Sequence, residues 1–137
     1  MLLNADGVIN SSSIPTEKLS SDKKYIVVLA HRNHLPVQST PIKLNKGKLS
    51  FDFTQSNIIG LKKKDKVMLM IAGNIDQTKT RSTRVINMED INTWRSANGK
   101  NSSYLREDID MNGDVSVHDQ SLVLENLDLS TSVNINE

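Results

Sequence analysis

The stretch Asp108-Ile-Asp-Met-Asn-Gly-Asp-Val-Ser-Val-His-Asp119 has the ligand spacing of a calcium-binding loop. Oxygen-bearing side chains stand at its first, third, fifth and twelfth positions, which are Asp108, Asp110, Asn112 and Asp119. Calcium takes about six to eight oxygen ligands from such a loop, with glycine at the sixth position and a main-chain carbonyl at the seventh. Gly113 and Asp114 occupy those two positions. Asp, Asn and Gly also favour ordinary turns, but an ordinary turn does not require this spacing, so we predict a calcium site.

A short helix is predicted directly after this loop, over residues 118–127, with Leu122, Val123 and Leu127 on its inward face. Val115, at the eighth position, is apolar. An apolar residue is expected there because the loop must attach to a core. Residues 108–119 are called loop two below.

An earlier stretch repeats the same unit in a weaker form, and we call residues 74–90 loop one. Asn74, Asp76 and Thr78 copy the first, third and fifth positions, and Asp90 copies the twelfth. Seven residues, 79–85, stand where loop two has only Gly113 and Asp114. Fewer carboxylates lower the affinity for a cation, so loop one is predicted to be the weaker site.

The repeat extends beyond the loops. A helix is predicted over residues 88–97, with Ile91 and Trp94 inward and an end at Asn98-Gly99. Residues 100–106 join the two copies, and Tyr104 and Leu105 are expected to pack between the helices.

The residues before loop one predict a small antiparallel β part. Residues 25–31 are β-branched and apolar on both faces, which indicates a central strand. Residues 37–44 contain Pro41 and fit an edge strand. Residues 48–53 alternate, with Leu49, Phe51 and Phe53 on one face. Other strands are expected at 2–10 and 67–72, with a hairpin turn at 45–47 and a link at 56–66.

Composition limits the function classes. The chain has 137 residues, 36% of them apolar and 4% aromatic, with no cysteine and a net charge of +1. The basic residues are scattered, so no nucleic-acid partner is expected. No apolar run approaches the roughly 20 residues that a membrane span needs. The first apolar residues meet polar ones at once, so we expect a piece of a longer polypeptide. We divide it into 1–66 and 67–137, with strand 67–72 assignable to either part.

The remaining candidate sites have ordinary structural explanations. His31 and His34 lack the further ligands that a zinc site needs. The basic run 62–66 could touch an anionic surface, but a charged turn is usually only solvated. Trp94 has helical spacing from Ile91, which indicates core rather than a sugar-stacking surface. No facing pair of carboxylates, Ser–His–Asp set or phosphate loop is present in the pattern, so we predict no catalysis.

Loop two with its helix resembles a dockerin repeat, since Asp119 stands where the related EF-hand loop has glutamate. The whole chain also resembles a carboxy-terminal module of secreted and surface proteins of Bacteroidetes. The matching stretches are Leu2-Leu-Asn-Ala-Asp-Gly-Val-Ile9, Tyr25-Ile-Val-Val-Leu-Ala-His-Arg-Asn-His-Leu35, Phe51-Asp-Phe-Thr54, Ala72-Gly-Asn-Ile-Asp76 and Tyr104-Leu-Arg-Glu-Asp-Ile-Asp-Met-Asn-Gly-Asp114. The chain departs from that pattern in lacking a strand before Leu2 and in its altered loop one.

This resemblance implies a mixed fold, in which a small antiparallel β-sandwich-like part precedes a dockerin-like pair of calcium loop–helix units. It implies a non-catalytic, calcium-binding module of a secreted or cell-surface bacterial protein that presents a protein-binding surface. Two alternatives stay open. One is an accessory subunit that packs through its β part in an outer-membrane assembly. The other is a glycan-binding module.

Overall fold

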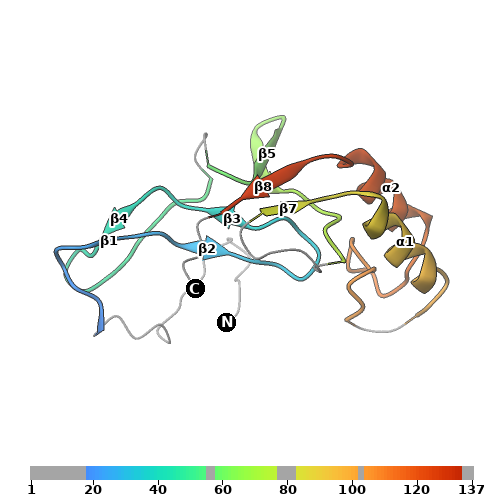
Figure 1. The fold of residues 1–137 in the computed structure, drawn as a ribbon, viewed down its shortest axis with the longest axis horizontal. Coiled ribbons are helices and arrows are strands. Elements are labelled where there is room, and N and C mark those ends of the chain that lie inside the picture. The colour runs from blue at the N-terminus through green and yellow to red at the C-terminus, as the bar shows by residue number, and fades with distance from the viewer. Residues whose placement is uncertain (1–17, 55–57, 77–82, 102–103, 134–137) are drawn as a thin grey trace.

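The computed structural model describes residues 18–54, 58–76, 83–101 and 104–133. Within them the chain forms eight short strands and two helices (Figure 1). In order they are β1 (Lys24–Tyr25), β2 (Val28–Leu29), β3 (Val37–Gln38), β4 (Ile42–Lys43), β5 (Leu61–Lys64), β6 (Val67–Met70), β7 (Thr83–Val85), α1 (Met88–Ala97), α2 (Val117–Glu125) and β8 (Ser130–Ser132). The strand predicted at 2–10 and the candidate ligand Thr78 lie outside the described residues.

The described strands form four separate antiparallel pairs, which are β1–β4, β2–β3, β5–β6 and β7–β8. The two helices lie side by side at one end of the molecule, and the β1–β4 pair lies at the opposite end (Figure 1). The prediction of a mixed fold is therefore confirmed at the level of short antiparallel pairs and two helices.

The roles predicted for residues 25–31 and 37–44 were wrong. Residues 25–31 do not form one central strand, because β1 pairs with β4 while β2 pairs with β3. The predicted edge strand holds the buried segment instead. In it, Val37 is 1% exposed, Gln38 N donates to the Ile59 carbonyl at 3.0 Å, and Ser39 N donates to the Val27 carbonyl at 2.9 Å. Backbone partners lie on both sides of β3, and an apolar composition alone does not specify such partners.

The segment predicted as a link contains a strand. β5 pairs with β6 in full register from Leu61↔Met70 to Lys64↔Val67, across a turn in which Asp65 has a positive φ of 55°. β6 is also not buried throughout, because Val67 and Leu69 are 58% and 41% exposed. Lys62 of β5 donates to Glu125 Oε1 at 2.9 Å, so part of the basic run contacts the end of α2.

The hairpin turn predicted at residues 45–47 is confirmed, but the prediction of a strand at residues 48–53 was wrong. Asn45 bridges to Lys48, and Lys46 and Gly47 both have positive φ, as a type I′ hairpin turn requires. Residues 48–53 form no extended ladder beyond that bridge, although Phe51 and Phe53 contact each other edge to face at 4.8 Å. Alternating apolar residues here pack without strand pairing.

The helices agree closely with the sequence pattern. α1 has its predicted bounds, and α2 begins one residue earlier and ends two residues earlier than predicted. Each helix begins with a capping box, formed by Asn87 with Asp90 in α1 and by Ser116 with Asp119 in α2. Such reciprocal capping satisfies main-chain donors that a helix start otherwise leaves unpaired.

One buried cluster unites the helices, both loops and the preceding strands. Its members are Leu35, Ile71, Ile75, Ile86, Ile91, Trp94, Ala97, Ile109, Val115 and Val123. Leu105, Leu122 and Leu127 pack against it, as predicted. Tyr104 does not, since it is 87% exposed and its ring lies under the Arg32 guanidinium at 4.7 Å.

The last described residues include a strand that the sequence analysis did not predict. β8 pairs with β7, so a strand follows α2 and joins the segment inserted in loop one. Thr131 in the middle of β8 and Val133 directly after it are 5% and 2% exposed. Serine-rich composition concealed this strand, because only one of its faces is buried.

Candidate metal centre

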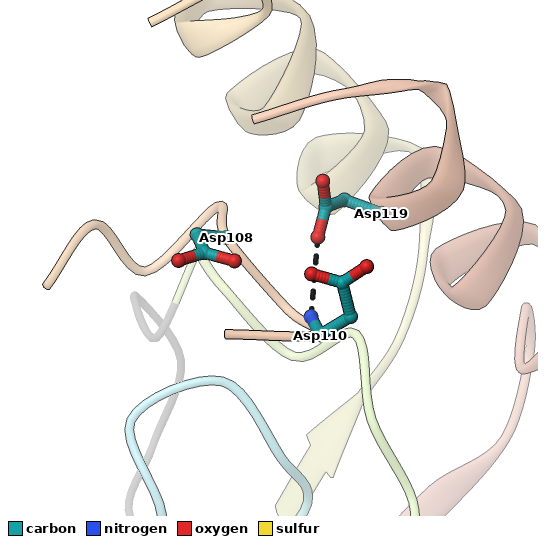
Figure 2. Close-up of side chains that lie close together, drawn as sticks. All are labelled: Asp108, Asp110 and Asp119. Atoms are coloured by element: carbon teal, nitrogen blue, oxygen red, sulfur yellow. Dashed lines mark hydrogen bonds between the residues drawn. The ribbon is translucent and has the colours of Figure 1, made fainter. Parts of the chain in front are cut away.

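Three carboxyl groups of loop two converge in space (Figure 2). Asp108, Asp110 and Asp119 each offer one oxygen, and these oxygens all lie within 4.8 Å of one another. Calcium–oxygen bonds are about 2.3–2.6 Å long, so two oxygens on one ion lie at most roughly 5 Å apart. The cluster therefore fits a single ion. Among the residues that the structure describes, no other group of three or more His, Cys, Asp or Glu side chains meets this condition.

Main-chain amides hold these carboxylates in place. Asp119, which is fully buried, accepts hydrogen bonds from Ile109 N at 2.6 Å, Asp110 N at 3.2 Å and Ser116 N at 2.8 Å. Asp108, which is 2% exposed, accepts from Asn112 N at 3.1 Å and Gly113 N at 3.0 Å. These contacts position the oxygens before any ion is bound, which reduces the ordering that binding must accomplish.

The other predicted ligands of loop two lie on the same turn. Asn112 Oδ1 accepts from Asp114 N at 2.8 Å, and its Nδ2 donates to Asp110 Oδ2 at 2.9 Å. Asp114 has an exposed side chain and bridges to Asn101 through its main chain. Gly113 has a φ of 99°, a conformation that glycine adopts at little cost.

Loop one reproduces the hydrogen bonds of the twelfth position. Asp90 is fully buried and accepts from Ile75 N at 2.7 Å, Asp76 N at 3.0 Å and Asn87 N at 2.9 Å. The corresponding donors to Asp119 are Ile109, Asp110 and Ser116. The internal repeat inferred from spacing is thus present in three dimensions.

The eighth positions of the two loops are also equivalent. Val115 N donates to the Lys100 carbonyl at 3.0 Å, and Gly99 N donates to the Val115 carbonyl at 2.9 Å. In loop one, Ile86 N donates to the Leu129 carbonyl at 3.0 Å, and Asp128 N donates to the Ile86 carbonyl at 2.8 Å. Each loop is thereby tied to the chain that leaves the other unit's helix, and Gly99 and Asp128 both have positive φ.

Loop one differs in the chemistry of its first position. Asn74 is 2% exposed, and its Nδ2 has no hydrogen-bond partner. An amide replaces the Asp108 carboxylate there, so Asp76 and Asp90 are the only carboxylates among the predicted ligands of loop one. Burial raises the pKa of Asp90, while main-chain hydrogen bonds from Asp76, Asn87 and Ile75 oppose that rise.

Sequence reasoning missed the role of Asn33. This residue is fully buried, and its Nδ2 donates to the Arg106 and Asp108 carbonyls, both at 3.1 Å. Its own carbonyl accepts from Gly73 N at 2.8 Å and Asn74 N at 3.1 Å. Asn33 therefore holds the starts of both loops. No local pattern marks this role, because its partners lie about 40 and 75 residues away in the chain.

The imidazoles of His31 and His34 are brought together by a turn. Their Nδ1 atoms lie 2.8 Å apart and lie 2.8 and 2.7 Å from Asn33 Oδ1. Burial first, and the neighbouring His31 second, lower the pKa of His34 to about 4. His34 is therefore neutral at pH 7. The described residues supply no third carboxylate, histidine or cysteine to make a metal cluster with this pair.

No protein-family model, curated protein or solved structure matches this chain. The described part of the chain also contains no helix that is long and apolar enough to cross a membrane.

Proposed function

We propose that this protein is a non-catalytic calcium-binding module of dockerin-like type, part of a secreted or cell-surface bacterial protein. The observation that carries the calcium assignment is the convergence of Asp108, Asp110 and Asp119 within 4.8 Å. The repeated loop–helix hydrogen bonds support the dockerin-like assignment. The bacterial surface location rests on the sequence resemblance.

Calcium acts structurally in this proposal. Asp108, Asp110, Asn112, the Asp114 carbonyl and Asp119 supply oxygens, and the ion offsets the repulsion between three nearby carboxylates. Helices of nine and ten residues are marginal on their own in water. An ion that fixes the first turn of α2 through Asp119 therefore stabilises the helix pair as well as loop two.

The ordered helix pair presents a surface for a protein partner. Met88 and Val117 occupy the same place in the two units, at the start of each helix, and are 55% and 63% exposed. Leu124 on α2 adds a third apolar side chain, 51% exposed. In this proposal these three apolar side chains are the ones that a protein partner contacts.

A glycan-binding function is the second candidate, and one residue favours it. Tyr104 is almost fully exposed beside a cavity that also reaches Asp108 and Asn112. An aromatic ring in that position could stack on a sugar. Trp94, the only tryptophan, is 4% exposed and donates from Nε1 to the Ser116 carbonyl at 3.0 Å, so it offers no second platform.

Thermal unfolding with calcium and with a chelator tests the proposal. Calcium at a hundredfold excess over its dissociation constant adds about 2.7 kcal/mol of stability. At roughly 3–4 °C per kcal/mol for a domain of this size, the melting temperature should rise by about 10 °C. Coincident melting curves would refute the calcium site.

Two neighbouring variants sharpen the experiment. Asp110→Asn removes a ligand charge and should largely abolish the calcium-dependent shift. Asp114→Asn is the matched control, because Asp114 contributes its main-chain carbonyl and its exposed side chain is not needed. Equal loss of the shift in both variants would contradict the assigned ligand register.

A further inference from the structure

A second cavity, whose lining includes no residue of loop two, lies between the turn at residues 31–34 and strand β7. Its volume is about 280 Å³. Its polar lining comes from His31, Arg32, His34, Asn74 and Arg84, and the rest of its lining is apolar. None of the described residues that line it is acidic. The described part of the wall therefore brings two guanidinium groups and no carboxylate to one cavity.

The Asn74 side chain supplies the second observation. Its Nδ2 is buried and has no hydrogen-bond partner in the protein, although it lines this cavity. A buried donor without a partner is costly, typically by about 1–3 kcal/mol. A ligand with acceptor oxygens in the cavity would satisfy this donor.

The amide and the imidazoles of the turn add polarity without adding negative charge. The orientation of the Asn33 amide is fixed because its Nδ2 donates to two carbonyl oxygens. The Asn33 Oδ1 atom consequently faces the Nδ1 atoms of His31 and His34 and lies within hydrogen-bond distance of both. No carboxylate from this turn opposes an anion.

We propose that this cavity binds a phosphate- or sulfate-type oxyanion, held by Arg32, Arg84 and the Asn74 amide. Guanidinium groups match tetrahedral and planar oxyanions through paired N–H donors, and two of them suit a dianion better than a single carboxylate. A water molecule occupies about 30 Å³. A cavity of 280 Å³ therefore admits one oxyanion with a small attached group or a few waters. This site is independent of the calcium proposal.

Isothermal titration of the whole chain with sodium phosphate, sulfate, acetate and chloride at matched ionic strength tests the proposal. The protein is loaded with one equivalent of calcium and desalted first, so that calcium phosphate does not precipitate. Phosphate and sulfate should bind at least about tenfold more tightly than acetate or chloride. A parallel titration with phenyl phosphate separates the sources, because a free-ion site rejects the ester and an ester site accepts it. Binding in either arm supports the proposal.

Three variants locate the site. Arg84→Gln should weaken phosphate binding about tenfold or more, the effect expected when one charge-assisted hydrogen bond is removed. Asn74→Asp replaces a donor by a carboxylate and should abolish binding. Arg95→Gln, on the exposed face of α1, is the matched control and should leave affinity unchanged.

Two results would overturn the proposal. One is phosphate binding no tighter than chloride binding. The other is equal phosphate affinity in the wild type and the Arg84→Gln variant. If Asn74→Asp does not fold, the comparison of Arg84→Gln with Arg95→Gln still decides.

Discussion

Replacing Asn33 by aspartate tests whether this residue holds the metal loop. Asn33→Asp keeps the size of the side chain and changes one amide nitrogen into an oxygen. That nitrogen donates to the Arg106 and Asp108 carbonyls, both at 3.1 Å, from a fully buried position. In the variant, a carboxylate oxygen faces two carbonyl oxygens and the donor is gone.

The magnitude follows from those two contacts. Leaving a buried acceptor unsatisfied costs about 1–3 kcal/mol, and two acceptors are affected here. The expected loss in the free energy of unfolding is therefore about 3 kcal/mol or more. Protonation of the new carboxyl group limits this loss, because a neutral acid can donate to one of the two carbonyls. Since whole domains are stable by only about 5–15 kcal/mol, this loss is a large share.

Urea unfolding with and without calcium measures the effect. Asn45→Asp is the matched control, because Asn45 is exposed and its hydrogen bonds to Lys48 are made by main-chain atoms. We expect Asn33→Asp to lower both stability and calcium affinity, since the Asp108 carbonyl begins loop two. If its stability lies within about 0.5 kcal/mol of the Asn45→Asp variant, Asn33 does not have this role.

Three further predictions concern single residues. Burial lowers the pKa of His34 to about 4, so between pH 6.5 and about 4 the unfolded chain binds a proton that the folded chain excludes. The free energy of unfolding should therefore fall as the pH is lowered through that window, by at most roughly 3 kcal/mol. His34→Gln should flatten this slope in urea unfolding at several pH values, and exposed His118→Gln should not. Gly113→Val should lower calcium affinity several-fold by calorimetry, since φ is 99° and the cost is conformational; the same change at Gly47 should strain its turn without altering affinity. The single tryptophan, Trp94, donates a hydrogen bond from Nε1 to the Ser116 carbonyl at the start of α2. Its fluorescence should shift to the red when calcium is removed, and an unchanged spectrum would contradict coupling between loop two and the helix pair.

The site was predictable from sequence where its information is local. Ligand spacing in residues 108–119 places Asp108 and Asp119 eleven residues apart along the chain, and one turn with a positive φ at Gly113 brings them together. Capping boxes likewise depend on residues three apart, so the start of α1 follows from Asn87 and Asp90. The geometry of such features is set by the spacing of residues that are close together in the sequence.

The β part was not predictable in the same way. Residues 25–31 are a strongly apolar run with β-branched residues, yet β3 is the segment with backbone partners on both sides. Strand pairing is decided by which distant segments meet, and side-chain composition reports that only indirectly. β8 shows the converse, since a serine-rich segment pairs because β7 provides an edge for it.

The position of Asn33 explains why the two parts of the molecule should respond to calcium together. Its carbonyl accepts from Gly73 and Asn74, and its side chain donates to the Asp108 carbonyl, so one residue of the β part contacts the first residue of each loop. An ion that orders loop two therefore also restrains Asn33, and through it the start of loop one. Because Leu35 N donates to the Ile71 carbonyl at 2.8 Å in the adjoining segment, the restraint continues into the strands. Calcium should accordingly protect amides of residues 33–39 from hydrogen exchange as well as those of the helices. A purely local metal loop would protect only residues 108–119 and α2.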